Sequence, residues 1–241
     1  STIPAFFIGR KIGGNIAGLF AGIIVAINSS LLGRTPAGFA DTDPYNIFFP
    51  LFIAWMFIEA IESKTNKKRI IYSCISGFLV GLYTKAWTGW WYPMMFVLVS
   101  LGLCFIYYTI INFKELKKGF KNYIKIPNIQ KTLIIFSGFF GISFLSSLFF
   151  VGFERFFRGI LGPLGFTTIK NVAVRSYWPN VLTTVAEFNI VPLKEIMNQM
   201  GGSLLFFIAI VGIILSVVIK KKNGERDVMY AIFLVLWFLG T

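Results

Sequence analysis

The chain has 241 residues, of which 56% are hydrophobic and only 14% are charged; soluble domains carry about 25% charged residues, so this balance excludes a soluble globular protein. The net charge of +13 would favour a nucleic-acid partner in a soluble protein, but here the basic residues lie in clumps between apolar runs, as in membrane proteins, and no nucleic acid is expected. The absence of histidine removes the commonest general base and the commonest zinc ligand.

Seven apolar segments predict membrane helices, because spanning takes about 20 apolar residues, or fewer where a helix is buried among others. In chain order they are Ile12–Leu32, Tyr45–Ile61, Ile70–Thr84, Trp90–Phe113, Thr132–Phe153, Ser203–Ile219 and Val228–Leu239. Cys74 and Cys104 fall inside them and are interpreted as small buried hydrophobes. Tracts of small residues, such as Gly13 to Gly18, predict close packing within a bundle. We therefore expect an all-α polytopic membrane protein.

Basic clumps alternate with the segments and predict their orientation. The clumps are Arg10 and Lys11; Lys64, Lys67, Lys68 and Arg69; Lys114, Lys117, Lys118, Lys121, Lys125 and Lys131; and Lys220, Lys221, Lys222 and Arg226. The positive-inside rule places them in the cytoplasm, so the loops at 33–44 and 154–202 face outward from the cell membrane. Five acids near the cytoplasmic ends are expected to form solvated ion pairs: Glu59, Glu62, Glu115, Glu225 and Asp227.

The loop at 154–202 is too long for a simple connector. It contains a predicted short helix over Val191–Met200, with Pro192 in its first turn and Gly201 and Gly202 after its end. We expect this loop to lie along the outer membrane surface, within one transmembrane domain that takes in residues 1–241.

Two carboxylates one residue apart, Asp41 and Asp43, stand at the predicted outer end of the second segment. Pro44 follows them, and proline favours the first turn of a helix. One of the two acids is therefore expected at the N-cap, where it accepts hydrogen bonds from free backbone N–H groups. This explains one Asp better than two, and Asp-x-Asp also suits a divalent cation that bridges to phosphate oxygens. On the residues alone, both interpretations stay open.

Two further groups of residues are predicted to face the same side. Glu187 is an isolated acid in an apolar and hydroxyl-bearing stretch, and it can be either a surface residue or part of a site. The turn Lys85-Ala-Trp-Thr-Gly-Trp-Trp-Tyr-Pro93 is rich in aromatic residues. Such residues favour a membrane boundary, and they can also pack against a sugar or a lipid-linked headgroup.

Taken together and in this order, the motifs resemble those of oligosaccharyltransferase catalytic subunits, most closely the archaeal members. The stretch from Arg34 to Asp43 resembles the family's second Asp-x-Asp-type motif, and Trp87-Thr-Gly-Trp-Trp-Tyr-Pro93 resembles its next outward turn. Thr184-Val-Ala-Glu187 resembles the Thr/Ser-x-x-Glu motif of its long external loop. The resemblance runs over essentially the whole chain. It implies a GT-C-type glycosyltransferase bundle that transfers a glycan from a polyprenyl or dolichyl (pyro)phosphate carrier to the Asn amide of Asn-x-Ser/Thr.

The resemblance also implies a role for each motif residue. Asp41 would be catalytic and a ligand of Mn²⁺ or Mg²⁺, Asp43 a second ligand, and Glu187 a catalytic residue that binds the acceptor amide and contributes to the metal site. The residues implied to bind substrate are Arg34, Trp91, Tyr92 and Thr184. The implied partners are a lipid-linked oligosaccharide, an acceptor polypeptide and membrane lipid. The family's first acidic motif and its C-terminal soluble domain lie outside these residues, so this fragment alone is expected to be inactive.

Two other functions stay open on the sequence. Another lipid-linked-sugar glycosyltransferase of the same membrane superfamily would share the outer acidic motif and differ in its acceptor. A membrane transporter would not depend on a metal, and the lack of acids in the middle of the segments argues mildly against it.

Overall fold

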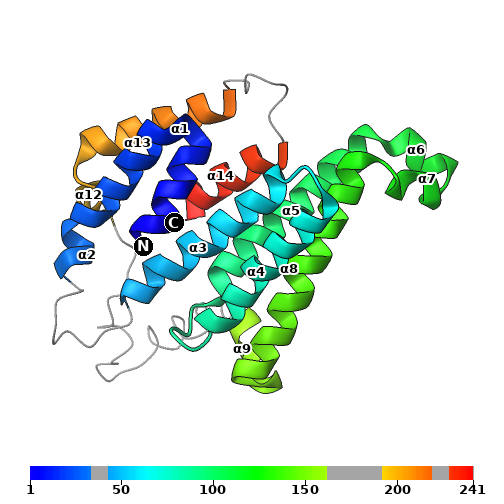
Figure 1. The fold of residues 1–241 in the computed structure, drawn as a ribbon, viewed down its shortest axis with the longest axis horizontal. Helices are drawn as coiled ribbons and strands as arrows, with labels where there is room; N and C mark the ends of the chain where they lie inside the picture. Colours follow the sequence, from blue (N-terminus) through cyan, green and yellow to red (C-terminus); the bar gives the residue numbers. More distant parts are fainter. Residues whose placement is uncertain (34–42, 162–191, 219–227, 241) are drawn as a thin grey trace, which may run out of the picture.

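A computed structural model of the chain describes residues 1–33, 43–161, 192–218 and 228–240, and every regular element in these ranges is a helix. In chain order the helices are α1 (Thr2–Ile27), α2 (Ser29–Gly33), α3 (Asp43–Glu62), α4 (Asn66–Tyr83), α5 (Trp91–Ile111), α6 (Phe113–Lys118), α7 (Phe120–Ile124), α8 (Pro127–Val151), α9 (Phe153–Ile160), α12 (Leu193–Gln199), α13 (Ser203–Val218) and α14 (Val228–Gly240) (Figure 1). By length and composition α3, α5 and α8 could each cross a membrane, and the bent pair α12–α13 could make another span. Helix α1 meets the same criteria of length and composition, but it is bent at Gly13 and Gly14 and is not one straight span. The predicted all-α polytopic fold is confirmed.

The first predicted segment, Ile12–Leu32, is wrong in its bounds, because the backbone reverses direction inside it. Gly14 has φ +84° and ψ −172°, a conformation that is essentially restricted to glycine. The two arms of α1 then pack against each other so closely that a Cβ on Gly9 would lie 2.7 Å from the carbonyl oxygen of Ala17. Small residues thus permit a helical hairpin, seen as the two blue rods of Figure 1.

The connection between the fourth and fifth predicted segments also differs from the prediction. It was expected only as a basic loop, but it contains the two short helices α6 and α7. Helix α8 begins at Pro127 rather than at Thr132, because proline suits the first position of a helix, where its missing N–H is not needed. In Figure 1, α6 and α7 stand out beyond one end of the bundle.

Helix α4 makes the most extensive helix contact described in the chain, and it does so with α8. Gly77 lies so close to α8 that a Cβ added to it would stand 2.5 Å from the carbonyl oxygen of Phe139. One turn further along α4, a Cβ on Gly81 would collide with the side chain of Ser146 in α8 and would lie 2.9 Å from the carbonyl carbon of that residue. The Ser146 hydroxyl donates to the carbonyl of Ile142 within α8 over 2.6 Å and also lies 3.4 Å from the Gly77 carbonyl oxygen of α4. The prediction that small residues mediate close helix packing is therefore confirmed here.

The hydrophobic core lies where α3, α4, α5, α8 and α14 meet. Phe57 of α3 is fully buried and contacts Phe139 of α8 and Phe233 of α14, with ring centroids 6.4 and 4.7 Å away. Large apolar side chains also cover the outside, where Phe149 is 84% exposed. An apolar exterior of this kind suits a bundle surrounded by lipid, because lipid tails are as apolar as the side chains themselves.

Basic residues gather at one end of the bundle, which we call the basic end. Lys11, at the turn of the α1 hairpin, contacts Glu59 and Glu62 of α3, with N–O distances of 2.9 and 3.0 Å. Lys131 at the start of α8 lies close enough to Arg69 and Glu62 to interact with them electrostatically. The predicted pairing of Glu59 and Glu62 with bases is confirmed, but the three side chains of the Lys11 cluster are only about one-fifth exposed, so the pairs are partly buried rather than solvated.

Replacing Lys11 with Met should therefore lower the free energy of unfolding by about 2 kcal/mol, between the values for exposed and buried pairs. The reason is that the change removes the ammonium group that lies 2.9 and 3.0 Å from two neighbouring carboxylates, so that their mutual repulsion is less well compensated. Thermal unfolding of the detergent-solubilised protein measures the effect. Lys11→Arg, which keeps the charge, should lose much less, and equal stability of Lys11→Met and the wild type would contradict the prediction.

Candidate functional site

Helix α3 begins at Asp43 with Pro44 in its first turn, as the proline predicted. The free N–H groups of this turn carry a partial positive charge that stabilises a nearby carboxylate. The structure places Asp43 here by its backbone, whereas Asp41 and Arg34 lie outside the described residues. The acid motif therefore ends at a helix start, and the choice between a helix cap and a metal ligand stays a prediction.

A chain of hydrogen bonds crosses three helices one turn inside this start. The Tyr83 hydroxyl, at the end of α4, donates to Oδ1 of Asn46 over 3.1 Å. Tyr92, in the first turn of α5, is hydrogen-bonded to Tyr83 through the two hydroxyl groups. Tyr83 is fully buried and stacks on Phe49 at a ring-centroid distance of 5.3 Å. These contacts hold the first turn of α3 against α4 and α5.

Asn46 and Tyr83 were not among the residues singled out from the sequence. A signal was present, because Asn46 and Glu59 are the two strongly polar side chains of the stretch Tyr45–Ile61, and Asn46 is the one at its predicted outer end. A polar group at the start of an apolar helix needs a partner, since an unpaired one in a nonpolar environment costs free energy. The partner, Tyr83, is 37 positions away along the chain, and no local pattern identifies it.

The aromatic turn between α4 and α5 has buried and exposed members. Trp90 is 4% exposed and stacks on Phe156 of α9. Trp87 is 36% exposed and meets Tyr92 edge to face, with ring centroids 5.8 Å apart. Trp91 and Tyr92 are half-buried and pack against the core. Of the three indoles in this turn, that of Trp87 therefore offers the most surface, while the substrate roles of Trp91 and Tyr92 stay predictions.

The described parts of the long loop at 154–202, which is predicted to face outward, are helices at its two ends. Helix α9 follows α8 directly after Gly152, whose φ of +80° is readily adopted only by glycine. The predicted helix over Val191–Met200 is confirmed as α12, and it makes an angle of 89° with α13. The position of this segment along the membrane surface stays a prediction. Thr184 and Glu187 lie outside the described residues.

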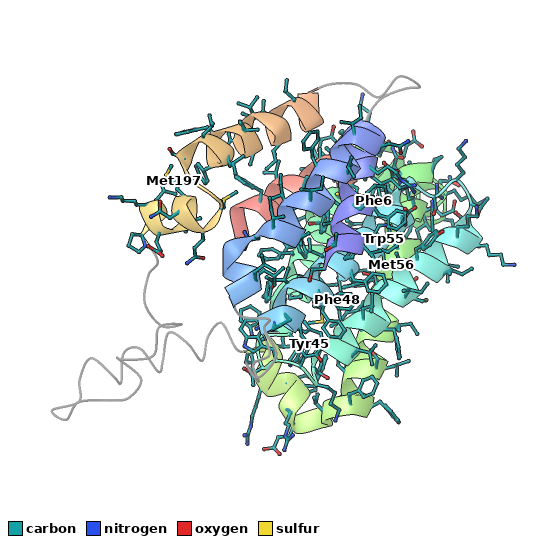
Figure 2. All side chains as sticks on the ribbon, turned by 60° about the vertical axis from the view of Figure 1, so that its left-hand side comes forward. Phe6, Tyr45, Phe48, Trp55, Met56 and Met197 are labelled. Carbon is teal, nitrogen blue, oxygen red and sulfur yellow. The ribbon has the colours of Figure 1, made fainter. Side chains whose placement is uncertain are left out.

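Figure 2 shows how these elements are spread along the molecule. Tyr45 and Phe48 mark the start of α3, and Trp55 and Met56 lie further along it, beside the α1 hairpin that carries Phe6. Met197 of α12 stands apart from them, next to α13. In Figure 1, the start of α3, the turn after α4 and α9 lie at the end of the bundle away from α6 and α7, opposite the basic end.

The metal expectation depends on side chains outside the described ranges. Within residues 1–33, 43–161, 192–218 and 228–240, no three His, Cys, Asp or Glu side chains lie close enough together to hold a metal ion. The predicted ligands, Asp41, Asp43 and Glu187, are all carboxylates. Carboxylate oxygens are the donors that hard divalent cations such as Mg²⁺ and Mn²⁺ prefer, so the chemistry of this donor set fits the ion.

These observations define the class of protein: an all-helical, multi-pass membrane protein with a basic end and an opposite end that bears aromatic residues and the last residue of an acid motif. The family described as "Oligosaccharyl transferase STT3, N-terminal" matches residues 1–239. The chain belongs to this family.

Three relatives are similar to nearly the whole chain. The dolichyl-phosphooligosaccharide-protein glycotransferase of Methanococcus voltae is 32% identical over 99% of this chain and 28% of its own length. A protein of the same name from Methanocaldococcus jannaschii is 25% identical, and the undecaprenyl-diphosphooligosaccharide–protein glycotransferase of Campylobacter jejuni is 26% identical, again over 99% of this chain and over 33% and 36% of their own lengths. The chain thus spans about a third of the length of these relatives. No solved structure matches it.

Proposed function

We propose that the full-length protein is an oligosaccharyltransferase, which transfers a glycan from a polyprenyl-type lipid carrier to the side-chain amide of asparagine in Asn-x-Ser/Thr. The observation that carries this proposal is the family match over residues 1–239. The relatives' names specify a dolichyl phosphate carrier in two cases and an undecaprenyl diphosphate carrier in the third. We therefore propose a polyprenyl-type carrier without specifying its length or its number of phosphates.

The proposed site lies at the end of the bundle where α3 begins, on the external face of the cell membrane. An amide nitrogen is a poor nucleophile because its lone pair is conjugated with the carbonyl group. Carboxylates of Asp41 and Glu187 that accept hydrogen bonds from both amide N–H groups would turn the nitrogen out of conjugation. A Mn²⁺ or Mg²⁺ ion held by Asp41, Asp43 and Glu187 would supply positive charge to offset the charge on the leaving phosphate.

Neighbouring residues have supporting roles in this proposal. The Tyr92–Tyr83–Asn46 hydrogen-bond chain keeps the first turn of α3, and with it Asp43, in a fixed place. The partial positive charge of that turn favours the ionised form of the nearby acids. The proposed substrate-binding side chains are Arg34, Trp91, Tyr92 and Thr184.

A transfer assay with the purified full-length protein tests the proposal. The substrates are a lipid-linked oligosaccharide and three peptides that differ at one position each: Asn-x-Thr, Gln-x-Thr and Asn-x-Ala. Mass spectrometry should find the glycan on the first peptide and little or none on the other two. Adding EDTA should stop the transfer, and added Mn²⁺ or Mg²⁺ should restore it.

Two outcomes would contradict parts of this proposal, one the acceptor and the other the metal ion. Glycan transfer to a sugar or lipid acceptor, with none to the Asn-x-Thr peptide, would favour another lipid-linked-sugar glycosyltransferase. Undiminished transfer to the Asn-x-Thr peptide in EDTA would contradict the proposed role of the metal ion, but not the proposed acceptor.

A further inference from the structure

The segment that joins α5 to α8 combines charge and exposed apolar surface in an unusual way. Helices α6 and α7 and their flanks contain five lysines, Lys114, Lys117, Lys118, Lys121 and Lys125, against the single acid Glu115. Two phenylalanines lie among them, and both are exposed: Phe113 at 51% and Phe120 at 66%. The ammonium group of Lys117 lies over the ring of Phe113, 5.0 Å from the ring centroid.

This segment is anchored to the bundle by its opposite face. Tyr123 of α7 is 2% exposed, and its hydroxyl is hydrogen-bonded to that of Thr109 in α5. Leu116 and Ile124 pack against the hydrophobic core. Gly119, with φ +142°, makes the turn between α6 and α7. The lysines and the two exposed phenylalanines therefore belong to an ordered surface rather than to a free tail.

The position of this surface indicates what it meets. It connects the end of α5 to the start of α8, and both helices are long and apolar enough to cross a membrane. The segment must then lie at the boundary between lipid and water. A basic loop that only faces water would not require exposed aromatic rings beside its lysines. Exposed rings beside lysines are typical of segments at a membrane surface, where the rings insert among acyl chains and the lysines contact anionic headgroups.

We propose that the α6–α7 surface binds anionic phospholipid headgroups of the leaflet at the basic end. The ammonium groups of Lys114, Lys117 and Lys121, all exposed, contact the headgroup phosphates. The rings of Phe113 and Phe120 enter the upper acyl region. The surface would hold the basic end at a fixed depth in the membrane, and it does not depend on the proposed glycan transfer.

The test measures binding of phosphatidylglycerol to the full-length protein in mixed micelles, with phosphatidylcholine as the neutral reference. The triple variant Lys114→Gln/Lys117→Gln/Lys121→Gln should bind phosphatidylglycerol more weakly by on the order of 10-fold or more, and the loss should shrink as salt is raised. The matched control is Lys64→Gln/Lys67→Gln/Lys68→Gln, which removes three other exposed charges near the same end. It should retain most of the binding.

Further variants test whether a loss of phosphatidylglycerol binding comes from unfolding of the protein or from a general loss of positive charge. The triple Lys→Arg change at positions 114, 117 and 121 keeps the charge and should bind like the wild type. Phe113→Ser/Phe120→Ser should weaken binding even at high salt, because the apolar contribution is not screened. Equal losses in the two Gln triples, or no preference for phosphatidylglycerol over phosphatidylcholine, would overturn the proposal. Preferential binding of added RNA by this surface would overturn it as well.

Discussion

Replacing Asp41 with Asn in the full-length protein is expected to lower the rate of glycan transfer by on the order of 10²-fold or more. Asparagine keeps the shape of the side chain and removes its negative charge, so the loss would report the charge rather than packing. Glu187→Gln should have an effect of similar size, and Asp43→Asn a smaller one if Asp43 is an auxiliary ligand. Initial rates with saturating lipid-linked oligosaccharide and peptide measure these effects.

Glu195 offers the matched control for these acids. It is an exposed acid of α12 and belongs to the same predicted external loop, 154–202, as Glu187. Glu195→Gln removes one charge from the same loop and should leave transfer near the wild-type rate. Near wild-type transfer by Asp41→Asn or by Glu187→Gln would refute the role assigned to that residue.

The second large effect is expected where α4 meets α8. Gly77→Ala and Gly81→Ala should each lower the free energy of unfolding by about 1–3 kcal/mol, the usual cost of overpacking. At Gly77 the added methyl group meets backbone atoms of α8, 2.5 Å from the oxygen of Phe139 and 2.9 Å from the nitrogen of Ser143. Backbone cannot rotate away as a side chain does, so the two helices must separate. Thermal unfolding in detergent measures the loss.

Glycines with free space provide the comparison for this prediction. A Cβ on Gly141 of α8 or on Gly102 of α5 would meet nothing within 4 Å. The same Gly→Ala change there should be neutral or stabilising by up to about 1 kcal/mol, because alanine is the better helix former. A similar loss of stability at all four glycines would show that α4 and α8 are not packed as described.

In lipid, the pairing of α4 with α8 depends mainly on close packing. Burying apolar side chains between helices gains little there, because lipid tails are as apolar as leucine, so van der Waals contact and interhelical hydrogen bonds decide the pairing. One such bond joins α4 to α3, where the Ser76 hydroxyl donates to the carbonyl of Ile53 over 3.0 Å. On the side of α8, the contact is made by the close approach of Gly77 and Gly81 to that helix. Helix α4 is therefore held on both sides through its small residues.

The candidate site was only partly accessible from the sequence. The start of α3 follows from Pro44, because the preference of proline for the first helical turn is a local property. The role of Asn46 does not, since it depends on Tyr83 and Tyr92 from two other helices. Trp90 likewise belongs to an aromatic-rich turn in the sequence, and only its burial against Phe156 of α9 separates it from the exposed Trp87.

The sequence by itself determined that this is an all-helical membrane protein, which residues form most of its helices, and which motifs relate it to its family. These properties follow from the length of apolar runs, from proline and glycine at helix ends, and from short motifs, all of which are local along the chain. Only the tertiary structure decided that α1 folds back at Gly14, that Lys11 pairs with Glu59 and Glu62, and that α4 packs on α8. Each of these depends on which surfaces fit together across many residues, and in a chain that is apolar almost everywhere, hydrophobicity alone does not distinguish one helix partner from another.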